Sequence, residues 1–199
     1  MNRTSVVVAQ VLLVLVPAAC GGNGGSGAGT FSTSVPGNRP LNDLSATELA
    51  TICADAMKFS SSSTLQADSC KLSGFLAASL DASFSPSATD AELEAACTQA
   101  LMSCTTTPST TTCDPAPANC TATVAELTAC ANDNAALEHN LASQVPACSA
   151  DTRATVNAKA NILLQALTLP ASCQTYEAKC PPTGAGGTTG GTPDGGASD

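Results

Sequence analysis

Cysteine is the residue type with the most chemistry to offer in this chain. There are eleven cysteines and a single histidine, His139. Structural zinc sites usually take close Cys or His pairs, and the thioredoxin-type redox motif is CxxC. The shortest separation between two cysteines here is seven positions, so neither kind of site is predicted. The sequence predicts no metal and no cofactor, and it favours structural disulfides.

Residues for acid–base or nucleophilic catalysis are sparse. A Ser-His-Asp or Cys-His mechanism would depend entirely on His139, and no GxSxG elbow occurs. We interpret His139 as a solvated helix residue. The carboxylates of Asp90, Glu92 and Glu94 fall at an expected helix start, where the helix dipole favours acids, and they lack calcium-loop spacing. The sequence therefore predicts no catalytic residue and no enzyme.

The first twenty residues have the layout of a secretory signal peptide. One positive charge, Arg3, precedes an apolar run from Val6 to Val16, which is too short to span a membrane and is typical of a signal peptide. Small residues, Ala18 and Ala19, then lead into Cys20. This arrangement resembles the lipobox of bacterial lipoprotein precursors.

In that family the cysteine is lipid-modified and becomes the first residue of the mature protein. The resemblance implies a signal peptide over 1–19, a lipid on Cys20 as membrane anchor, and a place in the bacterial cell envelope. Gly21 stands where many lipoproteins retained in the inner membrane carry Asp, which favours the outer membrane. Pro17 departs from the family's Leu, Val or Ile, and ordinary signal cleavage after Ala18, giving a secreted protein, is the alternative.

The net charge limits the possible partners, and the number of cysteines indicates the cellular compartment. The formal net charge is −9, which argues against nucleic acid as a partner. Eleven cysteines behind a leader indicate an oxidising compartment. Setting Cys20 aside leaves an even set of disulfide candidates: Cys53, Cys70, Cys97, Cys104, Cys113, Cys120, Cys130, Cys148, Cys173 and Cys180.

Hydrophobic periodicity predicts an all-α, disulfide-stabilised helical bundle over 41–182, between a lipidated, Gly-rich flexible tether over 20–40 and a disordered tail over 183–199. Capping boxes at Ser45–Glu48 and Thr123–Glu126 mark two helix starts. Further helices are expected from about Leu65 to Leu80, from Ser87 or Thr89 to Cys104, over 151–169 in one piece, and from Pro170 as first helical residue to Cys180. A Thr-rich, non-helical connector is expected over 105–119.

The cysteine spacing suggests an internal repeat. Two sets of four cysteines share similar spacings, so the domain is interpreted as two related three-helix units, over 45–104 and 123–180. Chance recurrence among ten cysteines is the alternative. Positions relative to the helix ends suggest two pairings, Cys53 with Cys70 and Cys120 with Cys173.

The sequence names no specific biochemical activity. It favours a lipid-anchored cell-envelope protein with a structural or protein-interaction role, whose partner is an unknown envelope or extracellular protein. The alternative is a secreted helical domain that binds a small ligand between its helices.

Overall fold

The computed structural model describes residues 29–106, 115–116 and 118–181, and this part of the chain is all-α. The helices are α2 (Ala46–Ser60), α3 (Ser63–Phe84), α4 (Asp90–Thr106), α5 (Val124–Gln144), α6 (Arg153–Lys159), α7 (Asn161–Ala166) and α8 (Ala171–Lys179), with 3-10 turns η1 (Leu41–Asp43) and η2 (Cys148–Ala150). No strand occurs among these residues. The predicted disulfide-stabilised helical bundle is confirmed. The predicted signal peptide, Cys20, Cys113 and the predicted C-terminal tail lie outside the described residues.

Side-chain caps fix the helix starts. Ser45 caps α2 and Thr123 caps α5, each with the Glu three residues later closing a capping box. Thr89 and Glu92 make the same exchange at the start of α4. The Ser45 backbone N–H is the main reason that the pKa of Glu48 falls to about 2. Both capping boxes predicted from the sequence are confirmed.

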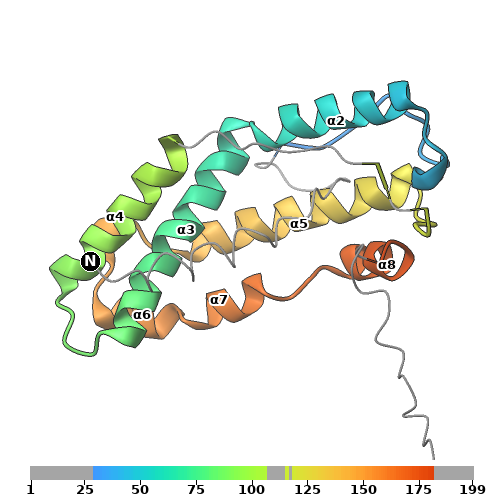
Figure 1. The fold of residues 1–199 in the computed structure, drawn as a ribbon. Coiled ribbons are helices and arrows are strands. Elements are labelled where there is room, and N and C mark those ends of the chain that lie inside the picture. The colour runs from blue at the N-terminus through green and yellow to red at the C-terminus, as the bar shows by residue number, and fades with distance from the viewer. Residues whose placement is uncertain (1–28, 107–114, 117, 182–199) are drawn as a thin grey trace, which may run out of the picture.

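The helices pack around α5, which spans the molecule. In Figure 1, α2 runs above α5, α3 and α4 lie at the left, and α6, α7 and α8 lie below. The first core cluster joins α2, the start of α5 and the flanking segments; its buried members are Phe31, Val35, Leu41, Ile52, Cys120, Ala122, Val124, Leu127, Ala131 and Cys180. The second joins α3, α4, the end of α5, α6 and α7; its members are Phe75, Ala78, Ala82, Leu93, Cys97, Leu141, Val145, Val156 and Ile162.

The segment over 29–40, predicted as part of the flexible tether, is instead folded onto the domain. Phe31 is 2% exposed, and its ring packs edge-on against Phe59 of α2. Its backbone N–H and C=O bond the amide side chain of buried Asn132 on α5, with the N–H donating at 2.7 Å. Val35 is also buried. The tether prediction was wrong here because it relied on the overall Gly- and Ser-rich composition and did not consider the two large apolar side chains, Phe31 and Val35, separately.

The stretch over 151–169 forms two short helices rather than one. The first, α6, ends at Lys159, and α7 begins at Asn161 after Ala160. The break lets Val156 and Ile162 both reach the second core cluster. Pro170 stands just before α8 in an extended conformation, as its N-cap and not as its first helical residue.

The packing does not separate into the two expected repeat units. Helix α5 contributes to both core clusters, and α3 and α4 pack with α6 and α7 across the proposed boundary. The second set contains four helices where the first contains three. The duplication therefore stays a hypothesis about ancestry and does not describe how the domain is built.

Candidate functional site

Four disulfides hold the described residues together. They join Cys70 to Cys104, Cys97 to Cys148, Cys120 to Cys180 and Cys130 to Cys173. Cys53 is also disulfide-bonded. Because the other eight described cysteines pair with one another, the partner of Cys53 lies outside the described residues.

Both suggested pairings were wrong. Cys70 meets Cys104 because α3 and α4 form an antiparallel hairpin, and this contact takes Cys70 away from Cys53. Cys173 meets Cys130 because α8 packs along α5. The sequence-based argument compared the distances of the cysteines from the helix ends. It could not predict which helices pack against one another.

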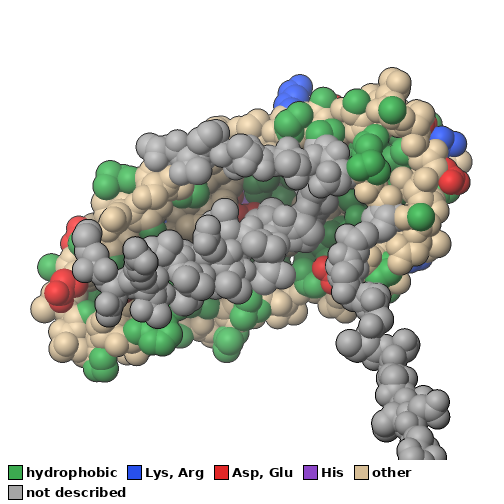
Figure 2. Space-filling model, viewed as in Figure 1, with side chains coloured by type: hydrophobic (Ala, Val, Ile, Leu, Met, Phe, Trp, Pro, Cys, Tyr) green, Lys and Arg blue, Asp and Glu red, His purple; other side chains and the backbone are tan. Residues whose placement is uncertain are grey.

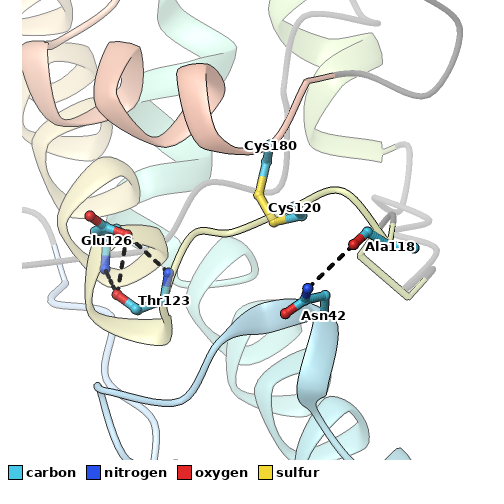
Figure 3. Close-up of a disulfide and its surroundings, with 6 residues drawn as sticks. All are labelled: Asn42, Ala118, Cys120, Thr123, Glu126 and Cys180. Carbon is cyan, nitrogen blue, oxygen red and sulfur yellow. Dashed lines mark hydrogen bonds between the residues drawn. A yellow bond between two sulfur atoms is a disulfide. The ribbon is translucent and has the colours of Figure 1, made fainter. Parts of the chain in front are cut away.

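The Cys120–Cys180 disulfide closes the end of the bundle shown in Figure 3, where it joins the segment before α5 to the end of α8. The capping pair of Thr123 and Glu126 lies beside it, and the Asn42 amide donates to the carbonyl of Ala118 at 3.3 Å. Lys179 of α8 forms an ion pair with Glu126, and its hydrogen bond is the main reason that the pKa of Glu126 is lowered. The disulfide, the helix cap and the ion pair together restrain this end of the bundle.

His139 lies on α5 with 42% of its side chain exposed, and it also has a partner that the sequence did not predict. Its Nδ1 lies 2.7 Å from Asp68 Oδ2, so the pair ties α5 to α3. Desolvation raises the pKa of Glu138 beside it, with the nearby Asp68 charge adding to the rise and the Ser69 hydroxyl opposing it. Imidazole and carboxylate together could relay a proton. Among the described residues, however, the hydrogen-bond partner of His139 is Asp68, and no serine, threonine or cysteine side chain is hydrogen-bonded to its imidazole.

An open groove of about 480 Å³ lies between α5 and the chain that runs from α7 to α8. Mostly apolar atoms line it, from Asp133, Ala136, Leu137, Gln165, Thr168, Leu169 and Pro170. Figure 2 shows apolar side chains along the lower edge of the molecule, where α6 and α7 run. Leu164 and Leu167 of this region are 70% and 63% exposed. The groove opens to the surface and does not enclose a ligand.

The most unusual polar group is the carboxylate of Asp151. The residue is 2% exposed, and neither carboxylate oxygen has a hydrogen-bond partner within the described part of the chain. Burial raises its pKa to about 6. It lies beside the Cys97–Cys148 disulfide: one carboxylate oxygen and the two sulfur atoms are all within 4.8 Å of one another.

Local structure explains this placement. Cys148 begins the 3-10 turn η2 and Asp151 follows it, so their side chains, three positions apart, project on the same side. Gly74 of α3 admits the disulfide, since a Cβ there would stand 3.0 Å from Cys97 Sγ and 3.7 Å from Cys148 Sγ. Sequence reasoning missed this site; the spacing in Cys148-Ser-Ala-Asp151 was the only available signal.

Comparison with known proteins does not place the chain in a family. No protein-family model matches it, and neither the curated proteins nor the solved structures contain a match. The described helices include none with the length and apolar character needed to cross a membrane. The disulfides indicate a location outside the cytoplasm, either extracellular or in the envelope.

Proposed function

We propose that this protein is a lipid-anchored component of the bacterial cell envelope, in which a disulfide-stabilised helical domain has a structural or protein-interaction role. Its anchor is the lipid on Cys20, and its site of action is the outer membrane. The proposal rests on the resemblance of the N-terminal residues to a lipobox. The disulfides add independent support.

The odd number of cysteines is the structural observation that supports this proposal. All nine described cysteines are disulfide-bonded, eight of them with one another. Cys53 can therefore take only one of the two remaining cysteines of the chain, Cys20 and Cys113, and the other has no partner within the chain. A free thiol is a liability in an oxidising compartment, whereas a lipidated Cys20 removes that liability.

The folded segment over 29–40 shortens the distance from membrane to domain. Only residues 21–28 separate Cys20 from Gly29. A Gly-rich chain of that length has a root-mean-square span of roughly 14–17 Å. The domain would therefore act close to the headgroups, where its partner would be another envelope protein at the same membrane.

Metabolic labelling with a fatty-acid analogue tests the anchor. The wild-type chain should take up the label and fractionate with the outer membrane, and Cys20→Ser should lose both properties. Cys113→Ser is the matched control, because it also removes one cysteine outside the described residues and should keep the label. Label that persists in Cys20→Ser would refute the anchor. Gly21→Asp should move the labelled protein to the inner membrane.

A second candidate function, a secreted domain that binds a small apolar ligand, is favoured by the groove between α5 and α7. Its open form suits a shallowly bound molecule. Binding of an environment-sensitive apolar dye, followed by its fluorescence, tests this function. If the groove is the binding site, Leu137→Ser should weaken the binding of the dye. Unchanged binding in this variant would remove the groove from consideration.

A further inference from the structure

We propose that the Cys97–Cys148 disulfide is a redox-active site that external thiols open, and that Asp151 is the acid–base group that exchanges a proton with the Cys97 sulfur. The substrate class is a thiol, either a small monothiol or a cysteine of a partner protein. This proposal goes beyond the structural role given above and does not depend on the anchor.

The two cysteines of this disulfide differ in their exposure. Cys97 of α4 is 2% exposed, whereas Cys148 at the start of η2 is half-buried. Thiol–disulfide exchange requires a thiolate to reach one sulfur of the bond. Attack therefore falls on Cys148, and Cys97 is the leaving group inside the protein.

A leaving thiolate in a buried position needs a proton, and Asp151 is placed to supply it. The desolvation of an unpaired carboxylate is costly, and such groups are retained where the protein uses them. Burial alone accounts for its raised pKa. With a value of about 6, the carboxyl can hold or release a proton near neutral pH.

Nearby charges are engaged elsewhere. The Arg153 backbone N–H donates to Asp90 at the start of α4, and the Arg153 guanidinium donates to the carbonyls of Ala82, Ser85 and Ala88. On α3, Lys71 donates to the carbonyl of Ala142. Among the described residues, the Asp151 carboxylate thus has no hydrogen-bond partner, and one of its oxygens lies within 4.8 Å of both sulfurs.

The reaction is a two-electron exchange. An external thiolate attacks Cys148 Sγ, the bond between the two sulfurs breaks, and Cys97 leaves as a thiolate that takes the proton of Asp151. A second external thiol then attacks the mixed disulfide, which releases an oxidised external disulfide and the Cys148 thiol. In the reverse direction, the Asp151 carboxylate removes the proton from Cys97, whose thiolate expels the external thiol from Cys148.

The chain contains its own control. Cys70–Cys104 also pairs a buried cysteine with a half-buried one on the same helix hairpin. Among the described residues, no carboxylate joins these two sulfurs in a cluster of the kind that Asp151 forms. A difference in reactivity between the two disulfides therefore reports on the carboxylate.

The test treats the folded, oxidised protein with reduced glutathione, quenches with iodoacetamide and maps the alkylated cysteines by mass spectrometry over time. Cys97 and Cys148 should be modified first, ahead of Cys70 and Cys104. Asp151→Asn should slow opening of Cys97–Cys148 by roughly 100-fold, at the lower end of general-acid contributions, and leave Cys70–Cys104 unchanged. Asp81→Asn removes an exposed carboxylate from α3 and should change neither rate.

Two results would overturn the proposal. The first is that, in the wild-type protein, Cys70–Cys104 opens before Cys97–Cys148 or at the same rate. This measurement needs no variant. The other is Asp151→Asn protein in which both disulfides change rate equally, because that would report a change in global opening.

Discussion

The buried carboxylate of Asp151 should make the stability of this protein depend on pH in a direction opposite to that of most carboxylates. The perturbation is Asp151→Asn, which keeps the size of the side chain and removes its titration. Burial raises the pKa of Asp151 from 3.8 in the unfolded chain to about 6 in the folded protein. Between these values the folded state binds a proton that the unfolded state has released. Stability is therefore lost as the pH rises through this window.

The expected magnitude follows from the shift. About two pKa units correspond to roughly 3 kcal/mol of unfolding free energy, present below pH 4 and lost above pH 6. Glu48 and Glu126, whose pKa values are lowered, act in the opposite sense, but they are common to both proteins. Their effects cancel when wild type and variant are compared at each pH.

Urea denaturation without reductant, followed by circular dichroism at 222 nm from pH 3.5 to 8, measures the difference. The unfolding free energy of the wild type, relative to Asp151→Asn, should fall by roughly 3 kcal/mol across the series. Asp81→Asn, which removes an exposed carboxylate, should run parallel to the wild type. A constant difference between wild type and Asp151→Asn at every pH would show that the Asp151 carboxylate is not desolvated.

Three further predictions concern the framework. Gly74→Ala should lower stability by about 1–2 kcal/mol in thermal melts despite its better helix propensity, because its Cβ would press on a disulfide sulfur at 3.0 Å and a backbone carbonyl at 3.1 Å; a raised melting temperature would contradict the close packing. Thr123→Ala should cost about 1 kcal/mol by removing the cap of α5, whereas Thr123→Ser should retain most of that stability in the same assay. Non-reducing peptide mapping should find Cys53 joined to Cys113; a link from Cys53 to Cys20 would refute the lipid anchor.

The helices could be predicted because their signals are local. Ser45 and Thr123 followed three residues later by Glu, and Ser85-Pro86 between two apolar stripes, act within a few positions of one another. The break at Ala160 was missed because it depends on where Val156 and Ile162 must point in the second core cluster. Helix propensity favours one continuous helix there, and packing decides against it.

The contacts that define the sites could not be predicted, because they join residues far apart in the chain. Phe31 and Asn132 are 101 positions apart, and Asp68 and His139 are 71 apart. Each partner alone resembles an ordinary polar or tether residue. Asp151 is the exception, since its position relative to Cys148 is local, but its burial depends on α4 supplying Cys97.

The position of Cys97–Cys148 in the framework gives its opening a structural consequence. This bond ties the α3–α4 hairpin to η2, and α6 and α7 follow η2 directly. Helix α8 is held separately by Cys130–Cys173 and Cys120–Cys180. Once the bond is reduced, α6 would be held by the hydrogen bonds of Arg153 and by the packing of Val156 in the second core cluster. Helix α7, which follows α6, contributes to the lining of the groove.

Selective reduction should therefore loosen one wall of the groove and spare the other elements. Hydrogen exchange before and after glutathione treatment should show lost protection in α6 and α7, with α8 and the start of α5 unchanged. Uniform loss across all helices would mean that this disulfide supports global stability alone. Loss confined to α6 and α7 would connect the redox state of Cys97–Cys148 to the groove between α5 and α7.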